Sequence, residues 1–436
     1  MEHDLLIINA FFYDPTWPVP INKGFLSINN GLITGFGRMS ELPAISARKT
    51  IEAENTLAMP GLINSHNHAA MTLFRGLADD LPLMIWLNEH IFPAEAQFVS
   101  EEMVYWCSKL AAAEMIMSGT TTVADGYFHE DQAAQAFADA GIRAIAAQGV
   151  IDFPAPGVPD PTKNVSSVAD FINRWQDHEL ITPAVFCHSP YTCSAQTVKN
   201  AKDLAAKTSS RFFIHLAETE FEVRKSKEEY EVSPVKYLHQ LGVLDESTVC
   251  VHSVWLDDED LQILRDSGAT VATCPESNMK LASGIAPLKE MLELGLTTGI
   301  GTDGCASNNN LDLFQEMNTC AKLHKVKNLD PTVLTAREVL KMATIGGAEV
   351  LGIAETTGSL EIGKRADLIL LDLKAPHLTP FYKPESLLVY AAGGQDVTTV
   401  IINGKLIMEN RQILSFDLTE CMKQVDRLSK KITKPI

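Results

Sequence analysis

Positive charge is scarce in this sequence. It has 36 Lys and Arg residues against 55 Asp and Glu residues in 436, a formal net charge of -19 at pH 7. Proteins that bind nucleic acid neutralise its phosphates with clustered Lys and Arg, so this balance argues against a nucleic-acid partner. No uninterrupted apolar run reaches the ~18 residues of a membrane-spanning helix. The acidic start Met1-Glu2-His3-Asp4 lacks the basic region of a signal peptide, and we expect a cytoplasmic protein with no membrane partner.

Paired cysteines are also absent. None of the eight cysteines belongs to a CxxC pair, and most lie in apolar stretches, where a reduced cysteine packs as a small hydrophobic residue. The chain also lacks the HxE and PCxxC motifs, which argues against a zinc site of the cytidine-deaminase type. We therefore expect eight reduced core thiols.

The chain is long enough for more than one hydrophobic core, since single cores usually stop growing at about 250–300 residues. Both of its ends contain β-type runs: residues 5–9, 25–28 and 32–36 near the start, and 367–372 and 397–408 near the end. Asn30-Gly31 and Asn403-Gly404 suit tight hairpin turns that need positive φ. We predict one small β-sandwich domain formed by residues 1–58 and 361–436.

The middle of the chain, residues 59–360, alternates short β-branched runs with longer amphipathic segments. This alternation is typical of βα units around a parallel sheet. Eight candidate strands begin near residues 61, 120, 143, 183, 212, 248, 269 and 296. Polar residues follow strand ends all the way round, so we predict an α/β fold with a (β/α)8 TIM-like barrel.

Four histidines and an aspartate follow strand ends in this barrel. His66 and His68 come directly after the first strand, and residues two apart in extended chain point the same way. His215 ends the fifth strand, His252 the sixth and Asp303 the eighth. Because the carboxyl ends of barrel strands meet at one mouth, these side chains are predicted to converge. Imidazole and carboxylate ligands suit a divalent ion such as zinc, with a position left open for water.

Four segments resemble signature segments of the amidohydrolase superfamily, and the resemblance spans nearly the whole chain. They are PGLINSHNH at 60–68, IHLAE at 214–218, VHS at 251–253 and GTDG at 301–304. Further motifs are similar to those of the 5'-methylthioadenosine/S-adenosylhomocysteine deaminase group: Trp86-Leu87, PAE at 93–95, CHSPY at 187–191 and DGCASN at 303–308.

This resemblance implies one divalent metal ion per chain, expected to be Zn²⁺, with His66, His68, His215 and Asp303 as ligands. Binuclear relatives carry a bridging lysine after the fourth strand, where this chain has His188. The resemblance also implies three catalytic residues. Asp303 takes a proton from the attacking water, His252 hydrogen-bonds that water or the developing oxyanion, and Glu218 delivers a proton to a ring nitrogen.

Substrate contacts are expected from four residues. By resemblance Glu95 faces the ribose; Trp86 offers a flat ring for a purine, and His188 and Ser307 complete the set. The predicted reaction is hydrolytic deamination of 5'-methylthioadenosine, S-adenosylhomocysteine, adenosine or 5'-deoxyadenosine, a small-molecule nucleoside partner. Relatives that bind the homocysteine carboxylate can place an arginine after the third strand, where this chain has Gln148.

Two alternative interpretations share the fold but differ in the reaction or in the metal site. Guanine deaminases and triazine hydrolases look similar over the same motifs and act on amino- or chloro-substituted heterocycles. A metal-free structural relative would need ligand positions to be vacant, and all four are filled here. The sequence leaves the preferred 5' substituent, the metal in vivo and the subunit number open, a homo-oligomer included.

Overall fold

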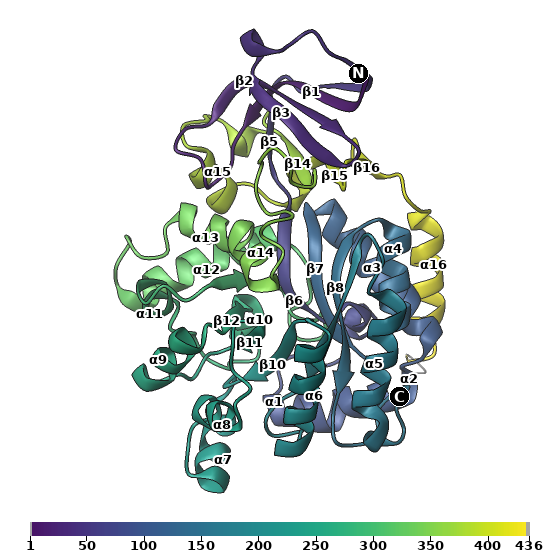
Figure 1. The fold of residues 1–436 in the computed structure, drawn as a ribbon, viewed down its shortest axis with the longest axis vertical. Coiled ribbons are helices and arrows are strands. Elements are labelled where there is room, and N and C mark those ends of the chain that lie inside the picture. The colour runs from purple at the N-terminus through teal and green to yellow at the C-terminus, as the bar shows by residue number, and fades with distance from the viewer. Residues whose placement is uncertain (1, 433–436) are drawn as a thin grey trace.

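The computed structural model describes residues 2–432 and contains a parallel barrel and a mixed sheet. The eight predicted barrel strands are all present, side by side in chain order. They are β6 (Leu62–Asn67), β7 (Thr120–Tyr127), β8 (Arg143–Val150), β9 (Ile181–Cys187), β10 (Phe212–Leu216), β11 (Thr248–His252), β12 (Thr270–Thr273) and β13 (Thr298–Ile300). Figure 1 shows these strands inside a layer of helices, which confirms the TIM-like fold.

The barrel closes between its first and last strands. The Asp303 N–H, just past β13, donates to the His66 carbonyl at 3.0 Å. Gly301 makes this approach possible, because a Cβ there would lie 2.7 Å from the His66 backbone nitrogen. The closure therefore brings two predicted metal ligands together through their own backbones.

Helices follow each strand and bury apolar faces against the sheet. Several of these helices begin at residues whose side chains cap the helix. Ser233 caps α8 (Pro234–Leu241) by accepting from the Lys236 N–H, as its Ser-Pro sequence predicts. The longer helices of the layer are α3 (Glu101–Met117), α4 (Glu130–Ala140), α5 (Asn164–Trp175), α6 (Ala195–Lys207), α7 (Glu220–Tyr230), α9 (Asp258–Ser267) and α12 (Leu313–Asn328).

The two chain ends meet in one nine-stranded sheet of order β17-β16-β15-β14-β5-β1-β2-β3, with β4 also paired to β1. Its N-terminal strands are β1 (Glu2–Phe12), β2 (Ile21–Asn29), β3 (Leu32–Arg38), β4 (Ser46–Glu52) and β5 (Thr56–Pro60). Its C-terminal strands are β14 (Leu368–Asp372), β15 (Val397–Ile402), β16 (Lys405–Glu409) and β17 (Gln412–Ile413). Asn30-Gly31 and Asn403-Gly404 form the predicted hairpin turns, each with both residues at positive φ.

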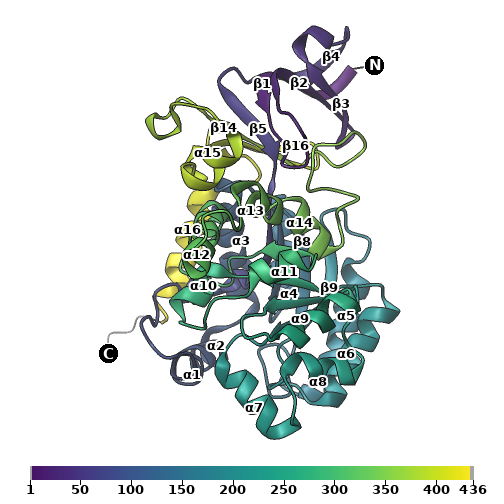
Figure 2. The same cartoon turned by 90° about the vertical axis from the view of Figure 1, so that its left-hand side faces the viewer.

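The small domain packs against the N-terminal ends of the barrel strands, away from the mouth (Figures 1 and 2). Arg143, the first residue of β8, donates to both carboxylate oxygens of Asp367, at 2.8 and 3.2 Å. The last helix, α16 (Leu418–Ser429), packs along α3 of the barrel, where the Cys421 thiol donates to the Trp106 carbonyl.

Domain boundaries at 58/59 and 360/361 remain our proposal. Within residues 2–432, no helix is both long and apolar enough to cross a membrane.

Candidate active site

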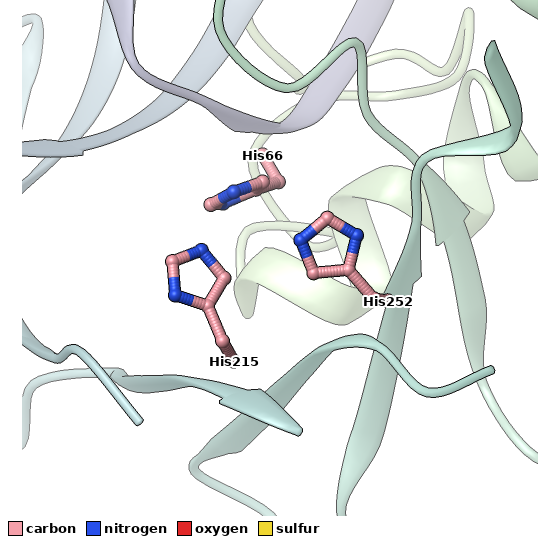
Figure 3. A group of neighbouring side chains, drawn as sticks. All are labelled: His66, His215 and His252. Carbon is pink, nitrogen blue, oxygen red and sulfur yellow. The ribbon is translucent and has the colours of Figure 1, made fainter. Parts of the chain in front are cut away.

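The mouth of the barrel brings together the four histidines and the aspartate. Nε2 of His66 and Nε2 of His68 each lie 3.4 Å from Oδ1 of Asp303. Ligand atoms of His66, His215 and His252 also lie within 4.8 Å of one another. Figure 3 shows these three rings, from three different strands, around one common space. The side chains thus form two overlapping groups that could each hold a metal ion.

Each of three rings is oriented through its other nitrogen. Nδ1 of His68 bonds to the Gly126 carbonyl at 2.6 Å, and Nδ1 of His215 to the His188 carbonyl at 2.8 Å. Nδ1 of His252 bonds to Oδ1 of Asn278 at 2.9 Å. A carbonyl partner requires a proton on Nδ1, so Nε2 presents its lone pair to the centre.

Burial keeps the imidazoles of His66, His68 and His215 neutral. It lowers the pKa of His66 to about 3 and the pKa of His68 and His215 below the usual value. Burial alone would raise the pKa of Asp303, but Nε2 of His66, 3.4 Å from its Oδ1, and the nearby His68 and His252 hold it well below its usual range. Nε2 of His66 is buried and has no hydrogen-bond partner among the described residues. Neutral imidazoles around one carboxylate, with an unused buried lone pair, fit a divalent cation.

The backbone is strained at the same strand ends. Ala217, His252, Ser253 and Asp303 all have positive φ, between 51° and 67°. Each such non-glycine residue costs roughly 1–3 kcal/mol and persists only where the surrounding structure fixes it. The strain turns His252 and Asp303 towards the centre, in the place where a barrel enzyme has its active site.

A pocket adjoins the centre; together with the solvent at its open mouth, it encloses about 1030 Å³ of empty space. Trp86 lines it from a π-helical turn, η3 (Trp86–Ile91). Glu95 lies in α2 (Phe92–Phe98), which has Pro93 in its first turn. The Tyr127 hydroxyl donates to Glu95 at 2.6 Å. Burial raises the pKa of Glu95 to about 7, although this bond opposes the shift.

Glu218 lies at the side of the pocket next to His252. Its Oε2 is 3.8 Å from Nε2 of His252, and its Oε1 accepts a bond of 3.2 Å from the Ser283 hydroxyl. The backbone N–H groups of Ala217 and Glu218 both donate to Glu222, each at 2.9 Å. This second carboxylate therefore fixes the turn from which Glu218 projects.

Two other predicted substrate contacts are held by bonds within the chain. The Ser307 hydroxyl donates to Oδ2 of Asp303 at 2.6 Å, although the residue also lines the pocket. His188 lines the pocket as well, and its Nδ1 bonds to the Thr192 hydroxyl at 2.9 Å. Burial lowers the pKa of His188 to about 3, so the ring is neutral.

Comparisons with known proteins agree with this geometry. The model of the amidohydrolase family matches residues 57–407. The chain belongs to the amidohydrolase family. It is 46% identical over 417 residues to a 5-methylthioadenosine/S-adenosylhomocysteine deaminase of Syntrophus aciditrophicus, covering 95% of this chain and 94% of that one. A 5'-deoxyadenosine deaminase of Methanosarcina mazei is 42% identical over 436 residues, with 98% of each chain covered. A crystal structure of an adenosine deaminase of Xanthomonas campestris with bound zinc superimposes with a TM-score of 0.97 at 35% identity, covering 99% of each chain.

This amidohydrolase also contains contacts that the sequence analysis did not single out. Ser277 and Asn278, which directly bond Asp303 and His252, follow the seventh strand. Polar residues that follow barrel strands face the mouth, so their position after the seventh strand is a signal that could have identified them. No local signal marks Tyr127, Glu222 or Ser283, whose partners lie on other parts of the chain.

Proposed function

We propose that the protein is a hydrolytic deaminase of adenosine-type nucleosides, with one zinc ion held by His66, His68, His215 and Asp303. The observation that carries this proposal is one pocket that joins the histidine cluster to two separate carboxylates, Glu218 and Glu95. The names of the relatives and the zinc in the Xanthomonas structure support it. In a metal-free structural protein, the buried Nε2 of His66 would have no bonding partner among the described residues.

The proposed chemistry begins with activation of water. A bound zinc ion would lower the pKa of water towards neutrality and so supply a nucleophile. Asp303, ionised and bonded by Ser277 and Ser307, accepts the proton of the attacking water. His252 orients that water by accepting a hydrogen bond from it through Nε2, since its Nδ1–H donates to Asn278.

Glu218 handles the second proton. Delivery of a proton from its carboxyl group to the neighbouring ring nitrogen makes the adjacent carbon electrophilic, and that carbon accepts the water oxygen. The proton on Asp303 then passes to the amino group, and the C–N bond breaks as ammonia leaves. The remaining hydroxyl proton returns to Glu218, and the carbonyl of the inosyl product forms. This division of work explains why two carboxylates, Asp303 and Glu218, both face the pocket.

Nucleoside binding uses the other side of the pocket. Trp86 and His188 offer flat rings for the purine, and ionised Glu95 accepts hydrogen bonds from the ribose hydroxyls. Ser307 acts through its bond to Asp303 rather than on the substrate.

The 5' substituent is expected to be uncharged. Among the described residues that line the pocket, none is Lys or Arg, and the loop after β8 contributes Phe153, Pro154 and Pro156. Gln148 accepts from the Glu130 N–H instead of lining the pocket. An amino-acid carboxylate would lose water here without gaining a cation, so methylthio or deoxy substituents bind better than homocysteine.

A substrate panel tests the proposal. Ammonia release would be measured for 5'-methylthioadenosine, 5'-deoxyadenosine, adenosine, S-adenosylhomocysteine, adenine and guanine, and chloride release for a chlorotriazine. We expect the neutral nucleosides to have the highest kcat/KM, with S-adenosylhomocysteine lower by about 10-fold or more, the effect of roughly 1–3 kcal/mol for an unsatisfied polar group. Best turnover of guanine or the triazine would overturn the proposal in favour of those hydrolases.

A further inference from the structure

The segment of residues 277–283 touches all three proposed proton-handling residues. It comprises the end of α10 (Pro275–Lys280) and the loop that follows, after strand β12. The Ser277 hydroxyl donates to Asp303 at 2.7 Å. Asn278 accepts from His252 at 2.9 Å, and the Ser283 hydroxyl donates to Glu218 at 3.2 Å. Strand β12 itself supplies none of the candidate metal ligands.

The 277–283 segment is itself held firmly. The Ser283 N–H donates to the Asn278 carbonyl at 2.9 Å, so its two ends are tied together. The indole of Trp255, three residues after His252, donates to the Ser283 carbonyl at 2.6 Å. Lys280 pairs with Asp79, in the loop that follows β6, at 2.6 Å.

Burial makes these contacts specific. Ser277, Asn278 and Ser283 are all buried, so water cannot readily replace them as partners. Glu218 has three rotatable side-chain bonds, and the Ser283 hydroxyl holds Oε1 while Oε2 faces His252. The segment fixes the relative positions of groups that come from three different strands.

We propose that Asn278 and Ser283 are positioning residues for the deamination reaction, with Ser283 acting through Glu218 and Asn278 through His252. This inference rests on the proposed function. The two residues serve different groups, so their loss should have different signatures. Ser283 serves the proton that goes to the ring, whereas Asn278 serves the water that attacks it.

A pair of substrates separates these roles. Hydrolysis of 5'-methylthioadenosine needs a proton on the ring and then expels ammonia. Hydrolysis of 6-chloropurine ribonucleoside replaces chloride by the water oxygen, giving inosine, chloride and a proton. Chloride is a weak base that leaves without protonation, and the ring is already electrophilic. The chloro substrate therefore depends on the water-activating groups and little on Glu218.

Ser283→Ala is expected to lower kcat for 5'-methylthioadenosine by about 10-fold, the effect of one lost hydrogen bond, with little change in KM. Its kcat for the chloro substrate should stay near that of the wild type. Ser283→Thr, which keeps the hydroxyl, should restore most of the loss. Asn278→Ala should lower kcat on both substrates by a similar factor.

Ser108→Ala is the matched control. Ser108, in α3, is equally buried, and its hydroxyl has no hydrogen-bond partner in the described chain. Zinc content and melting temperature are measured for every variant and should not change. A general folding defect lowers activity on both substrates, so the ratio of the two kcat values decides for Ser283. For Asn278→Ala, unchanged zinc content and melting temperature separate the expected loss of kcat from a folding defect.

An unchanged ratio in Ser283→Ala overturns the inference for Ser283, and a normal kcat in Asn278→Ala overturns it for Asn278. Failure of the proposed function would appear differently, as absence of nucleoside deamination in the wild type itself.

Discussion

The barrel buries charged groups at both ends, but it satisfies them differently. At the N-terminal end, both oxygens of Asp367 accept from Arg143, and further donors come from the Thr357 hydroxyl and the Asn403 N–H. At the mouth, His66 keeps a buried nitrogen with no partner among the described residues, and the backbone of His252 and Asp303 is strained. At the N-terminal end the buried carboxylate of Asp367 has hydrogen-bond partners within the chain, whereas at the mouth a buried nitrogen has none among the described residues.

This difference distinguishes buried polar groups that hold the fold together from buried polar groups that can bind a ligand. A buried ion pair whose hydrogen bonds are complete offers nothing to a ligand, but removal of one partner leaves an uncompensated buried charge. A cluster with unused lone pairs and positive φ values costs stability until something else binds. Mutations at the two ends should therefore differ in which property they damage, and the following experiments test that contrast in order of expected effect.

The largest effect is expected from His66→Ala combined with His68→Ala. Removing two proposed ligands should abolish zinc binding and lower kcat/KM by at least about 10³-fold. Elemental analysis of the wild type should give about one divalent ion per chain, which the double variant loses. Two ions per wild-type chain would contradict the mononuclear assignment.

Arg143→Met should lower the stability of the fold but leave the zinc site and the activity intact. It leaves the buried Asp367 carboxylate without its cation, which costs about 3–5 kcal/mol of stability. Denaturant and thermal unfolding should shift strongly, whereas kcat of the folded enzyme and its zinc content should be preserved. A large loss of kcat at permissive temperature would show that the two ends are coupled.

Glu218→Gln is expected to retain zinc and substrate affinity but to lower kcat by at least about 10²-fold, as is typical for loss of a general acid. Steady-state kinetics with 5'-methylthioadenosine measure this directly. A variant with near-normal kcat at saturation would assign the ring proton to another group.

Glu95→Ala sharpens the contrast within the mouth. Bonds from the ribose hydroxyls to a carboxylate contribute roughly 1.5–3 kcal/mol each, so kcat/KM for 5'-methylthioadenosine should fall about 10- to 100-fold. Free adenine has no ribose, and any trace activity on it should barely change. Equal losses on both substrates would show that Glu95 is not a ribose ligand.

The smallest effect is a shift in pH dependence. Burial raises the pKa of Glu95 to about 7, so ribose binding by the ionised form should weaken as the pH falls through about 7. The Tyr127 hydroxyl bond lowers this pKa, and Tyr127→Phe should therefore raise it. The acid limb of kcat/KM for 5'-methylthioadenosine should move to higher pH in the variant. An unmoved limb would assign it to another group.

Most of the fold could be predicted from the sequence because each barrel strand is a short apolar run with its own turn signals. His66 and His68 could be placed together because extended chain sets residues two apart on one side. The Ser233-Pro234 helix start and the Asn-Gly hairpins depend on local chemistry alone and are confirmed.

The finer contacts depend on geometry that no local pattern contains. Glu95 lies where η3 and α2 continue one another, and its hydrogen-bond partner Tyr127 lies 32 residues further along the chain. Ser307 turns its hydroxyl to Asp303, which the positive φ of Asp303 brings within reach. Ser283 and Glu218 lie 65 residues apart, on different loops, and only the closed barrel makes them neighbours.

The shared sheet of the two chain ends has a consequence for synthesis on the ribosome. Strand β5 is complete at Pro60, but its partner β14 begins at Leu368, so the whole barrel is translated between them. At about 5–20 residues per second, this takes roughly 15–60 s. During that interval β5 has one open edge, which can recruit strands from other chains. A nascent chain that stalls or is cut just after the barrel keeps this edge exposed and should aggregate, even though every residue of the mouth has already been made.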